Sequence, residues 1–162
     1  MSIPSVTVTT QFLSFRLAQE EFAIDISRIK EVLEFTTVTK IPRTPDFMCG
    51  VINLRGSVVP VVDLRLKFGM PNGEKTVNTC IIIIDVLQDG ESATIGALVD
   101  SVKEVMELDP AQIEPPPRLG VGLSDNYIRG MGKQQEQFVM LLDTDRIFSS
   151  EELSFLQNSG TT

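Results

Sequence analysis

Few side chains in this chain could carry out covalent chemistry. The sequence contains no histidine, which removes the commonest general base, the serine and cysteine triads that depend on one, and most zinc sites. Asp63 and Asp143 each stand where an expected strand ends and a short segment with helical periodicity begins. We interpret both carboxylates as helix N-caps, which accept hydrogen bonds from the first N–H groups of a helix. The pattern therefore predicts no enzymatic activity and no metal site.

The charge and hydropathy of the chain exclude several kinds of partner. Its 162 residues hold 14 basic and 22 acidic side chains, a formal net charge of −8. Nucleic acids and anionic membranes repel such a chain on average. The longest purely aliphatic run is Ile81 to Ile84, far short of the roughly 20 residues that span a bilayer. Because residues 1–10 also lack the features of a secretion signal, we expect a cytoplasmic protein without direct membrane insertion.

Short segments with strand-like patterns, separated by turn residues, must position any functional side chains. Arg55-Gly56 and Asp89-Gly90 are two of the dipeptides that favour tight turns. Eight segments pair into four expected hairpins: 11–17 with 22–26, 51–54 with 57–62, 78–87 with 92–99, and 129–132 with 137–142. No long segment has helical periodicity, so the pattern predicts an all-β, barrel-type fold with short helices. Ser150-Glu151-Glu152 is expected to open a C-terminal helix.

An internal repeat is the most informative feature of the sequence. Residues 26–34 match residues 99–107 at a separation of 73, and Lys-Glu-Val occurs at the same place in both copies. Residues 59–63 match residues 139–143 at a separation of 80, so the second copy holds seven additional residues, which fall in a proline-rich segment. Duplication of one β-unit explains matches that keep the same order and the same turns.

The repeat sets the expected domain boundaries. One domain is expected over residues 11–157, and each copy is expected to form its own small barrel. The approximate limits are 11–75 for the first barrel, 76–148 for the second, 150–157 for the C-terminal helix, and 1–10 and 158–162 for flexible tails.

One long motif closely resembles the signature of the CheW family of bacterial chemotaxis coupling proteins. The motif is Gly50-Val51-Ile52-Asn53-Leu54-Arg55-Gly56, leading into Val59-Pro60-Val61-Val62-Asp63-Leu64-Arg65. Gly50 and Gly56 are expected at structural turns, and Gly56 is expected to take a positive φ in its hairpin. Pro60 cannot donate a hydrogen bond to a neighbouring strand, so its strand should lie at an edge or beside a bulge. The resemblance extends over residues 11–157.

The resemblance implies a fold and a function. Members of the family consist of two intertwined five-stranded barrels of SH3-like type, with no catalytic activity and no cofactor. They couple the cytoplasmic tips of methyl-accepting chemotaxis receptors to the CheW-like regulatory domain of the histidine kinase CheA. By this resemblance the protein is a monomer in isolation that is recruited to receptor arrays at the membrane.

The resemblance also implies the contact residues. In the family a helical hairpin of the receptor lies in the groove between the barrels, and by position the groove residues here are Leu13, Ile26, Ile29, Glu31, Val32, Arg55 and Val102. Kinase and ring contacts fall at the barrel ends, where the matching residues are Glu114, Arg118 and Leu119. The charges of Glu114 and Arg118 are reversed relative to the arrangement that the family leads us to expect.

Two other functions stay open from the sequence. The first is coupling in a parallel chemosensory pathway, such as twitching motility, which the residues do not distinguish from chemotaxis. The second is a small-ligand-binding barrel or an enzyme of unrecognised type. An apolar cavity of ligand size inside either barrel would favour this second function, whereas solid side-chain packing would remove it.

Overall fold

The computed structural model describes residues 9–71, 73–88, 90–115, 127–134, 137–149 and 152, and within them the regular secondary structure consists almost entirely of strands. The strands are β1 Thr10–Leu17, β2 Glu20–Asp25, β3 Ile29–Glu34, β4 Met48–Leu54, β5 Ser57–Asp63, β6 Cys80–Gln88, β7 Glu91–Val99, β8 Ser101–Leu108, β9 Ile113–Glu114, β10 Ile128–Gln134 and β11 Gln137–Leu142. One short helix, α1, spans Leu64–Lys67, and two 3-10 turns span Ile26–Arg28 (η1) and Pro110–Gln112 (η2).

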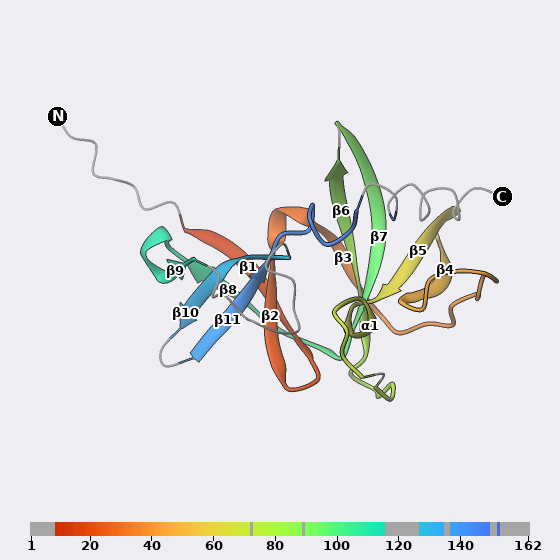
Figure 1. Ribbon diagram of the computed structural model, residues 1–162, viewed down its shortest axis with the longest axis horizontal. Coiled ribbons are helices and arrows are strands. Elements are labelled where there is room, and N and C mark those ends of the chain that lie inside the picture. The colour runs from red at the N-terminus through yellow and green to blue at the C-terminus, as the bar shows by residue number, and fades with distance from the viewer. Residues whose placement is uncertain are drawn as a thin grey trace.

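The strands form two sheets, which lie side by side in Figure 1. Sheet 1 has the order β8-β1-β2-β11-β10-β9, and sheet 2 has the order β3-β6-β7-β5-β4. Each sheet therefore takes strands from both repeat copies: sheet 1 combines the first hairpin of copy one with the later strands of copy two, and sheet 2 does the reverse. The expected all-β fold of two intertwined units is confirmed.

The expectation that each copy forms its own barrel, over residues 11–75 and 76–148, is wrong in one respect. The boundary separates the copies along the sequence but does not separate the sheets in space. Short connections explain why each copy contributes strands to both sheets. Only η1 joins β2 to β3, and only Asp100 joins β7 to β8. A one-residue connection is shorter than the two-residue loop of the tightest common hairpin, so the chain continues into the other sheet.

Matched pairing registers show that the two sheets are copies of one another. The parallel pair β11–β2 sets Leu141 opposite Ala23, and the parallel pair β5–β7 sets Val61 opposite Gly96. The two pairs are equivalent in the repeat, because Leu141 follows Val61 by 80 residues and Gly96 follows Ala23 by 73 residues. The register also shifts at the same place in each copy, between Met48 and Gly50 and between Ile128 and Gly130. The sequence repeat is therefore a structural pseudo-two-fold.

Three groups of buried side chains hold the molecule together. The largest draws on both sheets, with Phe15 and Phe22 from sheet 1 and Ile82 and Ile84 from sheet 2, all fully buried. The second lies on the other face of sheet 1 and includes Phe12, Ala23, Met106, Leu108, Val139 and Leu141. The third lies on the other face of sheet 2 and includes Ile52, Val59, Val61, Ile81, Ile83 and Leu98. Side chains thus fill each sheet's own interior as well as the layer between the sheets.

The two expected helix caps differ in outcome. Asp63 is the N-cap of α1, and its carboxylate accepts hydrogen bonds from the N–H groups of Arg65 and Leu66 at 2.9 and 3.4 Å. The Asp143 carboxylate likewise accepts the N–H of Asp145 at 3.1 Å, but no helix follows it, since residues 144–146 form a turn and residues 147–148 a bend. There Asp145 directs its carboxylate to Arg28 and to the N–H of Leu87 instead, which holds the segment against the neighbouring strands.

Only the start of the expected C-terminal helix lies within the described residues. Glu152 is helical, and Ser149 exchanges two hydrogen bonds with it: the Ser149 N–H donates to Glu152 Oε1 at 2.8 Å, and the Glu152 N–H donates to Ser149 Oγ at 3.1 Å. This reciprocal capping box starts the helix one residue before the expected Ser150. The rest of the helix and most of the expected tails, residues 1–8 and 158–162, lie outside the described residues.

Candidate functional site

Three of the exposed aliphatic side chains lie on the end strands of the two sheets or on the turn that leads into one of them. On η1 and β3, Ile26 and Val32 are 36% and 41% exposed, and on β8 Val105 is 48% exposed. Ile29 and Val102, next to them in sequence, are half-buried and pack against the largest core cluster, which the two sheets share. We call these five residues the edge-strand surface. Their exposure has a cost in water, so the surface is a candidate for covering by a partner.

The recurring Lys-Glu-Val sequence has a structural explanation in two matching β-bulges. In β3 the register shifts between Ile29 and Glu31 against β6, and in β8 it shifts between Val102 and Val105 against β1. Each bulge adds one residue, so aliphatic residues three apart come to lie on the same face of the strand. The bulges therefore place Ile29 with Val32, and Val102 with Val105, toward the layer between the sheets.

Glu31 and Arg55 form a two-pronged ion pair on the other face of β3, where Glu31 lies opposite Ile83 and Val32 opposite Ile82. Arg55 Nη1 and Nη2 donate to the two carboxylate oxygens of Glu31 at 2.7 and 2.9 Å. Hydrogen bonding from Arg55 holds the pKa of Glu31 below its ordinary value, and the same bonds raise the pKa of Arg55. The Arg55 side chain is 73% exposed, so it can contact a partner while it stays hydrogen-bonded to Glu31.

The β4–β5 turn directs Arg55 toward Glu31. Arg55 and Gly56 both have positive φ, 52° and 88°, as the two central residues of a type I′ hairpin require. The Gly56 N–H donates to Asn53 Oδ1 at 2.8 Å, which fixes the turn from within. The motif Asn53-Leu54-Arg55-Gly56 is thus a turn that presents one guanidinium.

The remaining expected site residues lie in different surroundings. Leu13 is only 8% exposed and belongs to the largest core cluster, next to Val105, its partner across the β1–β8 ladder. Glu114 is exposed on the two-residue strand β9, opposite Met131 of β10. Arg118 and Leu119 lie outside the described residues. Val105 was missed from the sequence, although its repeat equivalence to Val32 is a signal that could have found it.

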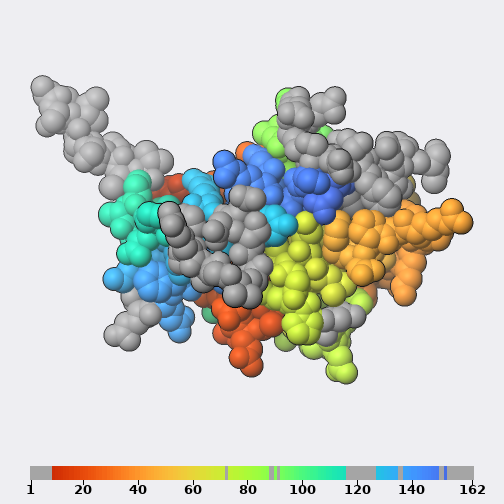
Figure 2. Space-filling model, viewed as in Figure 1, coloured from red at the N-terminus to blue at the C-terminus, as the bar shows by residue number. Residues whose placement is uncertain are grey.

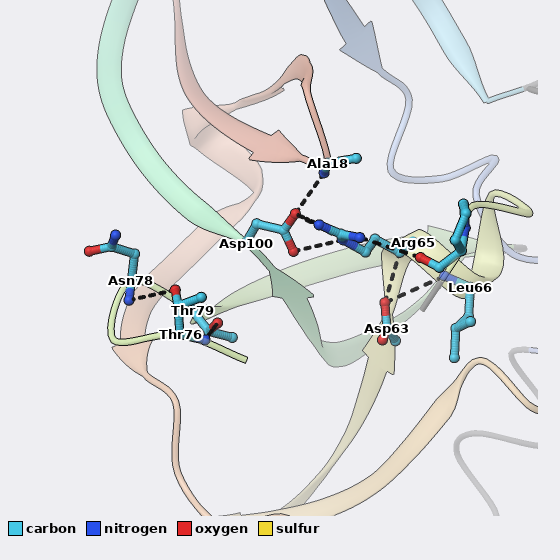
Figure 3. A network of polar contacts seen from close by, with 9 residues as sticks. Ala18, Asp63, Arg65, Leu66, Thr76, Asn78, Thr79 and Asp100 are labelled. Atoms are coloured by element: carbon cyan, nitrogen blue, oxygen red, sulfur yellow. Dashed lines mark hydrogen bonds and ion pairs between the residues drawn. The ribbon is translucent and has the colours of Figure 1, made fainter. Parts of the chain in front are cut away.

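Asp100 ties the two sheets together at the crossover from β7 to β8, as Figure 3 shows. Its carboxylate accepts two hydrogen bonds from Arg65 Nε, at 2.8 and 2.9 Å, and a further contact from Arg65 Nη2. It also accepts from the backbone N–H of Ala18, in the β1–β2 turn, at 2.6 Å. One side chain therefore links α1, which follows sheet 2, to the first hairpin of sheet 1.

The other crossover, from β2 to β3, carries a similar contact with the charges exchanged. Arg28 of η1 donates to both oxygens of Asp145 at 3.2 and 2.8 Å. Asp145 is the repeat equivalent of Arg65, and Arg28 follows the equivalent of Asp100 by one residue. Asp145 also accepts from the backbone N–H of Leu87, on the β6–β7 hairpin, at 2.8 Å. Both crossovers are thus anchored by an acid, an arginine and a hairpin amide.

Aromatic residues surround Lys67 at the junction of the two halves of the chain. Its ammonium lies 5.2, 5.1 and 5.9 Å from the ring centres of Phe47, Tyr127 and Phe148. It donates to the Tyr127 hydroxyl at 3.0 Å and pairs with Glu152 at 3.1 Å, and its side chain is only 8% exposed. Figure 2 shows the segment after β11, in blue, against the yellow-green segment that includes α1. The cage therefore fastens the end of the described chain to α1.

A hollow of about 540 Å³ lies among the β3–β4 loop, β4 and α1. Charged side chains, among them Lys40, Asp63 and Lys75, share its lining with apolar ones such as Phe35 and Ile41. A small-ligand-binding barrel calls for an apolar cavity within a barrel, and this hollow has a mixed lining beside loops. Within the described residues, no group of three or more His, Cys, Asp and Glu side chains could hold a metal ion. No helix in that part of the chain is long and apolar enough to cross a membrane.

Comparison with known proteins identifies the family. Residues 11–152 match the family model described as CheW-like domain. The chain is 39% identical over 152 residues to the chemotaxis protein CheW of Klebsiella aerogenes, covering 94% of this chain and 89% of that one. It is 32% identical over 142 residues to the chemotaxis protein CheW of Rhizobium meliloti, covering 88% of this chain and 89% of that one.

A solved structure agrees with these sequence matches. The crystal structure of the scaffolding protein TtCheW from Thermoanaerobacter tengcongensis superposes with a TM-score of 0.80 at 33% identity. The match covers 90% of this chain and 96% of that one. The expected SH3-like CheW fold is therefore confirmed, and the chain belongs to the CheW-like family.

Proposed function

We propose that this protein couples the cytoplasmic tips of chemoreceptors to the histidine kinase CheA, as a non-enzymatic chemotaxis scaffold. The observation that carries the proposal is the edge-strand surface, with exposed aliphatic side chains on both sheets, next to a strand whose Glu31 holds the exposed guanidinium of Arg55. A partner helix with an apolar stripe would cover these side chains, and its polar groups would meet the Glu31–Arg55 pair. Coupling in a parallel chemosensory pathway and small-ligand binding are less well supported, given relatives that are named chemotaxis proteins.

Apolar burial supplies the binding energy in this proposal. Covering a few aliphatic side chains at ~25 cal/mol per Å² yields only several kcal/mol before the cost of association. Each receptor contact is therefore weak by itself, and retention in an array depends on simultaneous contacts with receptor and kinase. Leu13 acts in this proposal from within the core, by packing beside Val105, its partner across the β1–β8 ladder.

The kinase contact belongs to a separate surface. Glu114 stands exposed on β9, at the end of sheet 1, and we assign it, with Arg118 and Leu119, to the contact with the regulatory domain of CheA. Because the charges of Glu114 and Arg118 are reversed relative to those expected for the family, the residues of the cognate kinase that contact them should carry reversed charges as well. A kinase variant with the exchanged charges would then restore binding to a protein that carries Glu114→Lys.

Binding of a soluble cognate receptor fragment, one that contains the cytoplasmic helical hairpin, tests the receptor half of the function. Val32→Asp places a charge in the apolar contact, and Arg55→Glu sets a like charge beside Glu31. Both variants should weaken binding by tenfold or more in a titration, about 1.4 kcal/mol or more, while keeping the circular dichroism spectrum of the folded protein. Val77→Asp is the matched control, because Val77 is 99% exposed and lies away from the surface in sequence. Unchanged affinity in both site variants would contradict the receptor contact.

A further inference from the structure

The two crossovers between the sheets are repeat equivalents, but they treat their apolar side chains differently. Ile26, in η1, is 36% exposed, whereas Val99, which follows it by 73 residues and ends β7, is 1% exposed. Val99 belongs to the core cluster that the two sheets share. Ile26 belongs to the edge-strand surface, so the β2–β3 crossover exposes an aliphatic side chain where the β7–β8 crossover buries one.

Core packing does not hold η1 in place. None of its three residues is buried, and Ile29, which follows it, is only half-buried against the shared cluster. The Ile29 N–H donates to the Ile26 carbonyl oxygen, and this hydrogen bond closes the 3-10 turn. Because a single 3-10 turn has little stability of its own, other contacts must fix its position.

Polar contacts fix η1 at both of its ends. At the start of the turn, Asp25 accepts the N–H of Ser27 at 2.9 Å, and Arg129 of β10 lies 3.5 Å from the same carboxylate. At the end of the turn, Arg28 donates to both carboxylate oxygens of Asp145 at 3.2 and 2.8 Å. Side chains from β10 and from the segment after β11 therefore determine where this part of the β2–β3 crossover lies.

The Arg28–Asp145 pair is the more specific of these contacts. A guanidinium that meets both oxygens of a carboxylate fixes orientation as well as distance. Asp145 is fixed in turn, because it also accepts the N–H of Leu87 in β6 at 2.8 Å. Both members of the pair are 30% exposed, and partly exposed ion pairs contribute little to overall stability. The main effect of this pair is thus on the position of η1.

We infer that Arg28 and Asp145 are positioning residues for the edge-strand surface, because their contact holds η1 so that Ile26 stays exposed in a fixed relation to Ile29. Without this contact the turn opens more often, and Ile26 loses its fixed place. The inference rests on the proposed function, since this surface is the one assigned there to the receptor. It adds two residues outside the surface to those that determine the affinity.

Amide hydrogen exchange tests the positioning in the protein alone. In Arg28→Ala and in Asp145→Ala, exchange of the Ile29 N–H should accelerate by about tenfold or more, because this N–H closes the turn. The urea midpoint should fall less than in Asp100→Ala, which removes the corresponding contact at the other crossover. Arg146→Ala, next to Asp145 in sequence, is the matched control and should leave Ile29 exchange unchanged.

A double-mutant cycle on binding separates positioning from direct contact with the partner. The ligand is the soluble receptor fragment with its helical hairpin. Arg28→Ala and Asp145→Ala should each weaken binding by about fivefold, and the double variant should weaken it by about the same factor, because all three lose one shared contact. Asp100→Ala should have a smaller effect on this affinity, since Val99 is held by the core.

Three results would overturn the inference: unchanged Ile29 exchange in the single variants, unchanged affinity in them, or losses of affinity that multiply in the double variant. Multiplied losses would show that the two side chains act independently of each other. Absence of any binding by the unaltered protein would instead overturn the proposed function.

Discussion

Arg65 and Asp100 face each other across the two sheets, and their contact is the most extensively bonded ion pair in the described part of the chain. The guanidinium comes from α1, which follows β5 of sheet 2, and the carboxylate comes from the single residue between β7 and β8. Asp100 also accepts the N–H of Ala18. Removal of this carboxylate leaves a largely buried guanidinium and a backbone amide without their acceptor.

Asp100→Ala should therefore lower the free energy of unfolding by about 2–3 kcal/mol. The measurement is urea denaturation followed by circular dichroism. Arg146→Ala is the control, because Arg146 is 69% exposed and, within the part of the chain that the structure describes, forms an ion pair only with Asp143, nearby in sequence, so its loss should cost less than about 0.5 kcal/mol. Equal losses of unfolding free energy in the two variants would show that the Arg65–Asp100 contact stabilises the fold no more than an exposed ion pair does.

Gly50 and Gly56 should respond differently to alanine, although both have positive φ. At Gly50, with φ of 144°, a Cβ would lie 2.1 Å from the carbonyl oxygen of Thr39, so the β4 backbone or the loop beside it would have to move. At Gly56, with φ of 88°, an added Cβ would meet no other atom within 4 Å. Gly56→Ala should cost only the backbone strain of about 1–2 kcal/mol.

Gly50→Ala should cost more than this, because a steric clash with backbone adds to the strain. Thermal unfolding of the two variants gives the comparison directly. A melting temperature for Gly50→Ala equal to or above that of Gly56→Ala would contradict the close approach of Thr39 to β4.

The repeat explains which parts of this fold were predictable. Matches such as Val59–Asp63 with Val139–Asp143 depend on strand periodicity and turn residues, so they predicted equivalent strands. The exchange of hairpins between sheets was not predictable from them, because the contacts within each sheet are the same whichever copy supplies the hairpin. What decides the exchange is the length of the connections at η1 and Asp100, and strand limits set by sequence are too imprecise to fix a one-residue connection.

The candidate site was predictable in part for a similar reason. Ile29, Glu31 and Val32 were chosen by their position in a family motif, and the structure places them on an end strand beside an exposed guanidinium. Periodicity alone would set Ile29 and Val32 on opposite faces of β3, and the bulge reverses this. Leu13 matched the motif equally well but lies in the core, since sequence does not separate a groove from the core beneath it.

The Lys67–Glu152 pair should give the protein an acid-sensitive component of stability. Burial by itself would raise the pKa of Glu152, but hydrogen bonds from Ser149 and Lys67 outweigh it and hold the pKa below the ordinary value of 4.5. A carboxylate with a lowered pKa stabilises the folded state above the ordinary value and ceases to do so as the pH falls through the folded-state pKa. Glu152→Gln should therefore flatten the dependence of stability on pH below about 4.5.

Urea denaturation of the two proteins between pH 3 and pH 7 measures this difference. At neutral pH the variant should be the less stable of the two, and the gap should close as the pH falls. Glu114→Gln is a suitable control, because Glu114 is exposed. A gap between Glu152→Gln and the unaltered protein that stays constant over this range would show that Lys67 does not hold the carboxylate ionised.

Ser14 should be essential to the bulge in β8 that places Val102 and Val105 on one face of the edge-strand surface. The side chain is 1% exposed, and its hydroxyl donates to the carbonyl oxygen of Glu104 at 3.0 Å and accepts the Glu104 N–H at 3.2 Å. The extra residue of a bulge leaves its backbone groups without partners in the adjacent strand, and Ser14 supplies both partners here. Ser14→Ala removes them within a buried site, which should cost about 1–3 kcal/mol.

Ser14→Ala should loosen the backbone at the β8 bulge more than it loosens the rest of the fold. Amide hydrogen exchange at Glu104 should accelerate more than exchange at Glu31, because the bulge in β3 does not depend on Ser14. Affinity for the receptor fragment should fall with it, since Val102 and Val105 lose the geometry that places them on one face. If Glu104 exchange is unchanged while overall stability falls, the hydroxyl contributes to packing and not to the bulge, and the β1–β8 ladder alone keeps Val102 and Val105 on one face.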